Sequence, residues 1–208
     1  MIYRIIYYIY FLSVGLSNSS LPTYTISDSL PKNMPIIKSL LWGEKGTLRN
    51  TFIDPKSRLK ELEIRHSMLQ LHQKIALFTL GSMVYQYQLG HSMSKNSYSS
   101  YTEIERKKHM NLGYLTFGCY MTAASLSILS PPGMKYTKKN KLSNMKLHRY
   151  LAIVHFTGMI IQPYLGYQSS IAGLEGRAAD RNRLLENHAT IGSITTFSYI
   201  LSFLTTLF

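Results

Sequence analysis

Residues 147–168, LHRYLAIVHFTGMIIQPYLGYQ, form an apolar stretch that carries no charged side chain after Arg149. Three more stretches of this kind occur in the chain, separated by segments rich in charged residues. An α-helix of about twenty residues is about 30 Å long, the thickness of the hydrocarbon layer of a bilayer. The pattern therefore predicts an all-α membrane protein, an antiparallel four-helix transmembrane bundle in up-down-up-down order. The predicted helices lie at about 69–90, 109–130, 147–168 and 187–208.

Small and polar residues are frequent in the predicted helices. The helices are rich in Gly, Ser, Thr, Tyr and Met, and the first helix also carries Gln86 and Gln88. Small residues let helices pack closely, and polar side chains in a membrane face the interior of a bundle rather than lipid. Either the small residues serve helix packing alone, or the bundle is built around a group held inside it.

Two segments precede the bundle. In residues 1–19, Arg4 is followed by a short apolar run, which is typical of a signal peptide or a signal anchor. Residues 20–65 contain four prolines and many Ser and Thr, which predicts a loop-rich extramembrane segment. Trp42 in this segment is either an interfacial anchor or part of a small local cluster. Residues 66–208 then form the four-helix transmembrane domain.

The charge of the chain belongs to its loops. Lys and Arg number 23 against 10 Asp and Glu, a net charge of +13. These basic residues flank the apolar stretches and are not interleaved with aromatic residues on a soluble surface, which argues against nucleic acid as a partner. They suit anionic lipid headgroups or an acidic redox partner instead. The single Cys excludes an intramolecular disulfide framework and a Cys-based zinc or iron–sulfur site.

Four of the seven histidines stand at the starts of the four predicted helices: His72, His109, His148 and His188. Consecutive helices joined by short loops alternate in direction, so the first and third helices start at one membrane face. His72 and His148 then face each other across the core at that face, and His109 and His188 do so at the other. Two histidines across a core, with a gap between them, are the arrangement for bis-histidine axial ligation of a haem iron.

Two glycines follow the second pair of histidines at the same spacing. Gly113 lies four residues after His109, and Gly192 lies four residues after His188. Residues i and i+4 share a helical face, so a glycine there leaves room where a porphyrin plane would lie. Ordinary glycine-mediated helix packing is the alternative explanation, and the recurrence on both helices favours the cofactor.

The remaining histidines are weaker candidates. His155 lies two turns after His148 on the same face, where it could ligate iron, donate a hydrogen bond to a haem propionate or contribute to a quinone site. His91 ends the first helix at the face of His109 and His188 and is a substitute ligand there, whereas His66 is predicted to be solvent-facing or interfacial. Zinc fits poorly, because it requires four converging ligands and the helices offer no Asp or Glu nearby.

The chain resembles the cytochrome b561 superfamily over residues 66–208. The resemblance rests on LHQKIALFTLG, KHMNLGYLTFG, LHRYLAIVHFTGMIIQPYLG and NHATIGSITTF. The third of these segments is the most specific, with its H-x6-H spacing, Gln162 and a terminal Leu-Gly. Members of the family have a four-helix core in which paired histidines bind two b-type haems, one near each membrane face. Eukaryotic members usually have six helices, and motifs for ascorbate are not recognisable in this sequence.

The resemblance implies two haems b, with His72 and His148 as ligands of one iron and His109 and His188 as ligands of the other. A single haem held by some of these histidines is the alternative. The implied function is transmembrane electron transfer by a membrane-embedded b-type cytochrome, with no catalytic residue assigned. Two other interpretations stay open: a non-redox membrane scaffold or assembly protein, and a haem-containing ferric or quinone reductase that uses Tyr164, Gln162 and His155.

The expected location is the inner cell membrane, crossed several times, with lipid as a partner. The electron donor and acceptor are unidentified, and a quinol, a small reductant or a redox protein would each serve; a homodimer is left open. Cleavage of the signal would place residues 20–70 outside the cytoplasm and the Lys-rich loop before residue 147 on the same side. The positive-inside rule favours the opposite orientation, so the two signals conflict.

Overall fold

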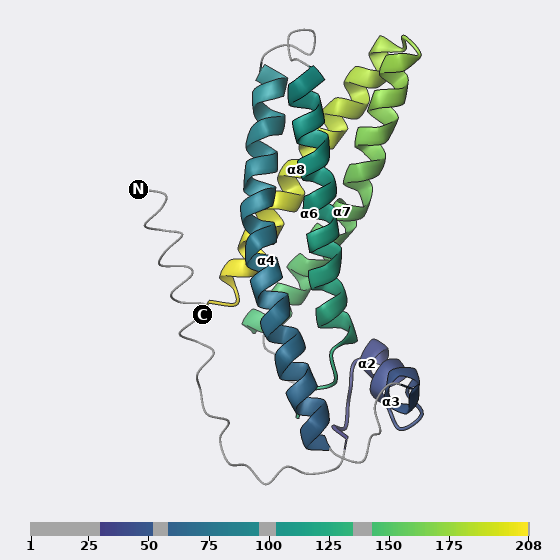
Figure 1. The fold of residues 1–208 in the computed structure, drawn as a ribbon, viewed down its shortest axis with the longest axis vertical. Helices are drawn as coiled ribbons and strands as arrows, with labels where there is room; N and C mark the ends of the chain where they lie inside the picture. Colours follow the sequence, from purple (N-terminus) through teal and green to yellow (C-terminus); the bar gives the residue numbers. More distant parts are fainter. Residues whose placement is uncertain (1–29, 52–57, 96–102, 135–142, 208) are drawn as a thin grey trace. The chain divides into compact units, whose positions relative to one another are not determined.

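The computed structural model describes residues 30–51, 58–95, 103–134 and 143–207, and all regular structure in these ranges is α-helical (Figure 1). The predicted all-α class is therefore confirmed for the described residues. The predicted signal segment, residues 1–19, lies outside them. The four long helices are α4 (Arg58–Lys95), α6 (Glu103–Leu129), α7 (Asn144–Leu174) and α8 (Ala178–Leu204).

All four long helices begin before their predicted starts, whereas α8 ends at Leu204, short of the predicted residue 208. α4 begins at Arg58 instead of near residue 69, and α8 begins at Ala178 instead of near residue 187. The added turns are rich in Glu, Arg and Lys, which are good helix formers although they are not apolar. Acidic residues such as Glu103 in the first turn of α6 also interact favourably with the helix dipole. Limits drawn from apolarity alone therefore miss these turns.

The chain divides into two compact units. The first contains the described residues up to His72 together with the segment from Leu126 to Met134, and the second contains Gln73–Ser125 and the residues from Ser143 onwards. Within the first unit, two short helices occupy the segment predicted as loop-rich. They are α2 (Ile36–Trp42) and α3 (Thr47–Thr51).

In the first unit, α2 covers the last carbonyl groups of α6. The Lys38 amine donates to the carbonyl oxygens of Ser127 at 3.0 Å and Ile128 at 2.9 Å, and Trp42 Nε1 donates to the Leu129 carbonyl at 2.9 Å. These groups have no partner within the helix, so the side chains replace water there. Burial and the nearby Arg65 guanidinium lower the pKa of Lys38 to about 8. Trp42 is only 3% exposed, which favours the local cluster over the interfacial anchor.

A buried group of ions fixes the start of α4. The Glu61 carboxylate is completely buried and pairs with Arg58 and with Arg49, whose Nε lies 3.0 Å from Glu61 Oε1. Arg58 Nη2 also donates to the carbonyl oxygen of Pro132 at 2.7 Å. A buried carboxylate is tolerated only when opposite charges and hydrogen bonds compensate for its lost hydration, and both are present here.

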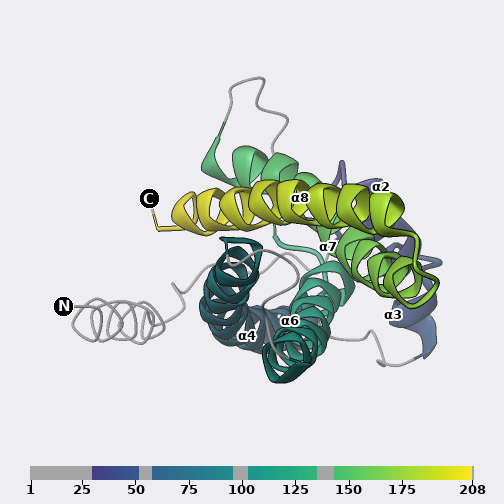
Figure 2. The same ribbon diagram turned by 90° about the horizontal axis from the view of Figure 1, so that it is seen from above.

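Four hydrogen bonds join the helices of the second unit in a ring, in the order α4, α6, α7, α8 and back to α4. Viewed from above, α4 lies beside α6, and α7 lies beside α8 (Figure 2). Helices α6 and α8 are thus at opposite corners of the ring. The bonds join Gln86 to His109, Tyr120 to His155, His148 to Ser202, and Tyr199 to Ala76.

The second unit has a mixed interior and a largely apolar exterior. A cluster of Met83, Tyr120, Met159 and Tyr199 lies at its core, and many small polar side chains are buried around it. The buried polar residues are Thr79, Ser82, Thr116, His155, Ser169, Thr195, Thr196, Ser198 and Ser202. Large side chains that are at least 50% exposed include Phe78, Tyr85, Tyr114, Leu115, Tyr150, Ile153, Tyr164, Tyr167, Ile194, Phe197 and Leu201.

Helix α6 stands out by composition. Among the helices in the described ranges, it alone is long and apolar enough to cross a membrane by these two criteria, whereas the sequence predicts four such helices. The other three carry charged or polar turns and several Gln, His, Ser and Thr residues, which lower their mean apolarity. Length and apolarity therefore single out one candidate span.

The close approach of α7 to α8 depends on Gly158. A Cβ atom at this position would lie 1.9 Å from Thr195 Oγ1 and 3.0 Å from Thr195 Cβ, so no larger residue fits without a shift of the helices. Gly81 in α4 has no such neighbour within 4 Å. An alanine side chain at position 158 would therefore collide with the neighbouring helix, whereas one at position 81 would not.

We predict that Gly158→Ala destabilises the protein by about 1–3 kcal/mol, because the added methyl group overpacks the contact with Thr195. Thermal unfolding of the purified protein, followed by circular dichroism, measures the effect. Gly81→Ala is the matched control and leaves the midpoint unchanged or slightly higher, since alanine favours a helix. Equal midpoints for the two variants would contradict the close contact.

Candidate cofactor site between α6 and α8

The centre of the candidate site is the pair His109 and His188, on the diagonally opposed helices α6 and α8. Their ring centroids lie 6.1 Å apart, and their planes are inclined by 69°. The Nδ1 atoms of both rings are buried and have no hydrogen-bond partner. A metal bound to two imidazoles at about 2 Å from each nitrogen would separate the ring centres by about 6 Å. The distance between the ring centres therefore matches that expected for one metal atom between them, and each ring keeps an unpartnered Nδ1 atom.

Two glycines make room for these rings. A Cβ atom on Gly90 would lie 3.1 Å from Cε1 of His109, and one on Gly166 would lie 3.5 Å from Cε1 of His188. The neighbouring helices α4 and α7 thus carry no side chain where they pass each ring. This leaves the two imidazoles against bare backbone.

The glycines predicted from the H-x3-G spacing have a different neighbour. A Cβ atom on Gly113 would lie 3.1 Å from the Gln86 amide nitrogen, and one on Gly192 would lie 3.4 Å from that of Gln162. Their missing side chains therefore admit a glutamine from the next helix. Both glycines also line the central cavity, and their predicted role beside a porphyrin stays a prediction.

A cavity of about 1060 Å³ contains the two histidines. It is large enough for a cofactor, since ligand pockets range from about 300 to 1,000 Å³. All its lining residues belong to the second unit, and they include Arg106 and Arg181, whose charge would suit carboxylate groups. The remaining lining residues of note are Gly90, Gly113, Gly166, Gly192, Gln86 and Gln162.

The site is built from two copies of one pattern. In α4 and α6, Gln86 and Gly90 stand against His109 and Gly113; in α7 and α8, the same residue types recur at the same spacings. The correspondence between the two halves also includes the preceding histidines. His72 in Leu71-His72 precedes Gln86 by the same number of residues as His148 in Leu147-His148 precedes Gln162. The second copy consists of Gln162, Gly166, His188 and Gly192. An alignment of the two halves of the sequence reveals that Gln86 and Gln162 correspond; from the sequence, Gln162 is expected only in a substrate site of the reductase alternative, and Gln86 has no assigned role.

His148 is held by α8. Its Nδ1 lies 3.0 Å from the carbonyl oxygen of Ser202 and 2.9 Å from the Ser202 hydroxyl oxygen. Donation from Nδ1 to a carbonyl leaves Nε2 as the free ligand atom, which is the usual arrangement of a metal-binding histidine. His72 belongs to the first unit, so its pairing with His148 stays a prediction from the sequence.

His155 lies in a buried aromatic cluster. Its side chain is 6% exposed, and its Nδ1 is 2.7 Å from the hydroxyl group of Tyr120. The ring of Tyr199 packs against it at a centroid distance of 4.9 Å. With Nδ1 engaged by Tyr120, His155 acts in a hydrogen-bond network between α6 and α7.

The other two histidines are peripheral. His91 lines the central cavity, and its ring is stacked on that of Tyr87 at a centroid distance of 6.1 Å. His66 lies in the first unit and is exposed, as the sequence predicts. Neither histidine contacts a ring of the central pair through a described interaction.

The donor set fits a haem better than a bare metal ion. In the part of the chain that the structure describes, no three His, Cys, Asp or Glu residues gather into a group that could hold a metal ion. Zinc would need about four such ligands, whereas a porphyrin supplies the in-plane nitrogens and requires from the protein only the two axial ones. His109 and His188 would provide them.

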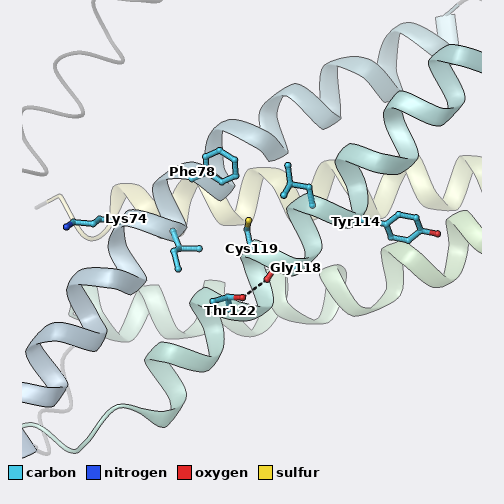
Figure 3. Close-up of a pocket in the computed structure, with 8 residues that line it drawn as sticks. Lys74, Phe78, Tyr114, Gly118, Cys119 and Thr122 are labelled. Atoms are coloured by element: carbon cyan, nitrogen blue, oxygen red, sulfur yellow. Dashed lines mark hydrogen bonds between the residues drawn. The ribbon is translucent and has the colours of Figure 1, made fainter.

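A second cavity, of about 480 Å³, lies between α4 and α6 (Figure 3). Lys74 stands at one end, and the remaining lining is largely apolar, including Phe78 and Cys119. The hydroxyl group of Thr122 is already engaged, because it donates to the Gly118 carbonyl at 2.8 Å. The described lining of this groove therefore presents no convergent polar groups.

Comparisons with models of known protein families, with curated proteins and with solved structures give no match to this chain. The resemblance to the cytochrome b561 superfamily therefore rests on the sequence segments alone.

We predict that Tyr120→Phe destabilises the protein by about 1–3 kcal/mol, because it leaves the buried Nδ1 of His155 without its partner. The free energy of unfolding of the purified protein measures this effect. Tyr150→Phe, at a tyrosine that is 60% exposed on the same helix as His155, is the control and changes little. A loss of similar size in both variants would contradict the specific role of the Tyr120 hydroxyl group.

Proposed function

We propose that this protein is a membrane-embedded b-type cytochrome that transfers electrons. The observation that carries the proposal is the pair His109 and His188, which face each other at 6.1 Å across a glycine-walled cavity with unpartnered ring nitrogens. A haem bound there would supply a one-electron change at its iron. The chain would supply the two axial ligands and a cavity closed by four helices.

The distribution of side chains supports a membrane location for all four long helices. Exposed Phe, Tyr, Ile and Leu cover the exterior of the second unit, and buried Ser, Thr and His lie inside it beside the apolar core cluster. In lipid this arrangement is favourable, because apolar side chains face the hydrocarbon and polar ones bond between helices. The exposed side chains accordingly extend to α4, α7 and α8 as well as the more apolar α6.

The ligand set favours electron transfer over substrate chemistry. With a histidine on each side, both axial positions of the iron would be filled, so no position would be open for a substrate. The surrounding helices would keep water away and set the local dielectric, which together tune the reduction potential. The chain thus fits an electron carrier better than a self-contained enzyme.

The repeat supports a second haem at the opposite end of the bundle. His72 and His148 hold corresponding positions in the two halves, as His109 and His188 do. The imidazole of His148 is already oriented by Ser202. Two such sites, one near each membrane face, would give electrons a path across the bilayer.

We predict that purified wild-type protein contains haem b and that His188→Ala removes about one haem per chain while the second is retained. The lost axial ligand explains the loss, and haem per protein, from optical spectra and protein mass, is the measurement. His66→Ala, at an exposed histidine of the first unit, is the control and keeps wild-type content. Folded wild-type protein without haem, or full haem in His188→Ala, would refute the assignment.

A further inference from the structure

Gln86 and Gln162 make the same contact in the two halves of the site. The Gln86 amide nitrogen donates to the main-chain carbonyl oxygen of His109 at 2.8 Å, and that of Gln162 donates to the carbonyl of His188 at 2.8 Å. We propose that these glutamines are positioning residues, which hold the backbone of the two axial histidines and so set the orientation of their imidazoles. This inference rests on the proposed haem site.

The glycines of the H-x3-G motif explain how the contact forms. Inside a helix, the carbonyl of residue i bonds to the N–H of residue i+4, and one lone pair of the oxygen is left over. The side chain of residue i+4 would normally stand beside that oxygen. Here residue i+4 is Gly113 or Gly192, and a Cβ atom there would lie 3.1 or 3.4 Å from the glutamine nitrogen. The glycine therefore exposes the histidine carbonyl to the next helix.

The same segment of the neighbouring helix also contacts the imidazole. Gly90 lies one turn after Gln86 and faces the ring of His109, and Gly166 lies one turn after Gln162 and faces the ring of His188. The Gln86 amide nitrogen additionally lies 3.2 Å from Nε2 of His109. Each Q-x3-G segment thus fixes one histidine at two points, its backbone through the glutamine and its ring beside the glycine.

These contacts, here called the glutamine clamp, would affect a bound haem. The two imidazole planes are inclined by 69°, and this angle depends on how α6 and α8 are rotated about their axes. Groups that orient a metal ligand from outside the first coordination shell typically change metal affinity 10- to 100-fold when they are removed. The glutamines would act from this position, since each donates to the main-chain carbonyl oxygen of a proposed ligand histidine.

The test replaces each glutamine by methionine, which has a similar length and no N–H group. In the full chain, purified in detergent with haem bound, Gln86→Met and Gln162→Met should each weaken haem binding at this site about 10- to 100-fold. They should also shift its midpoint potential and its electron paramagnetic resonance spectrum. Transfer of haem to an excess of apomyoglobin measures the affinity. Gln88→Met, at an exposed glutamine of the same helix, is the matched control.

Wild-type affinity, potential and spectrum in both glutamine variants would overturn the clamp. Should Gln86→Met fail to fold, Gln162→Met tests the same contact on the other helix pair. Gly113→Ala is a further variant, because its methyl group displaces the Gln86 amide without deleting it, and it should shift the spectrum in the same direction. Absence of haem from the wild-type protein would instead refute the proposed function, so the two failures are distinguishable.

Discussion

Hydrogen bonds from polar side chains to the backbone of a neighbouring helix hold the second unit together. In the proposed membrane location, burying further apolar surface would stabilise the bundle little, so close packing and interhelical hydrogen bonds would hold its helices together. Gln86 and Gln162 provide such bonds at one end of the unit, and His148 with Ser202 provides another toward the far end of α8. The position of His109 opposite His188 depends on these contacts.

The two halves of the site repeat each other but are not identical. Tyr120 and Tyr199 follow His109 and His188 at the same distance, yet their hydroxyl groups have different partners. Tyr120 bonds to the ring of His155, whereas Tyr199 bonds to the backbone of Ala76. A titratable partner is therefore present on one side of the bundle only. The pattern shared by the two halves positions the pair His109 and His188. The two halves differ at the tyrosine, because only the hydroxyl group of Tyr120 bonds to a further buried imidazole, that of His155.

The sequence alone could predict the helices and the juxtaposition of His109 with His188. Both follow from periodic apolar stretches and from the alternation of helix direction, which are local or topological properties. The glutamine contacts could not be found in this way, because a glutamine in an apolar stretch does not reveal which backbone atom it meets. Only the register shared by the two halves, with glutamine and glycine at equal spacings, carries that information.

Other features depended on contacts between distant residues. The cluster of α2 with the end of α6 buries Trp42 through a bond to Leu129, and no short motif announces this pairing. The charged first turns of α4 and α8 are helical because their residues favour helices and because Glu61 and Asp180 interact favourably with the helix dipoles, whereas the predicted limits follow apolarity. Length and apolarity likewise select α6 alone among the described helices. Gln86 and Gln162 interrupt the apolar stretches of α4 and α7.

The central claim is that one iron is held between the imidazoles of His109 and His188. Electron paramagnetic resonance of the oxidised, detergent-purified chain, combined with near-infrared magnetic circular dichroism, reports the axial ligands of a ferric haem directly. The account predicts low-spin iron with two imidazole ligands, and loss of one such signal in His109→Ala. A high-spin centre in the wild-type protein, or a bis-imidazole spectrum unchanged by His109→Ala, would contradict it.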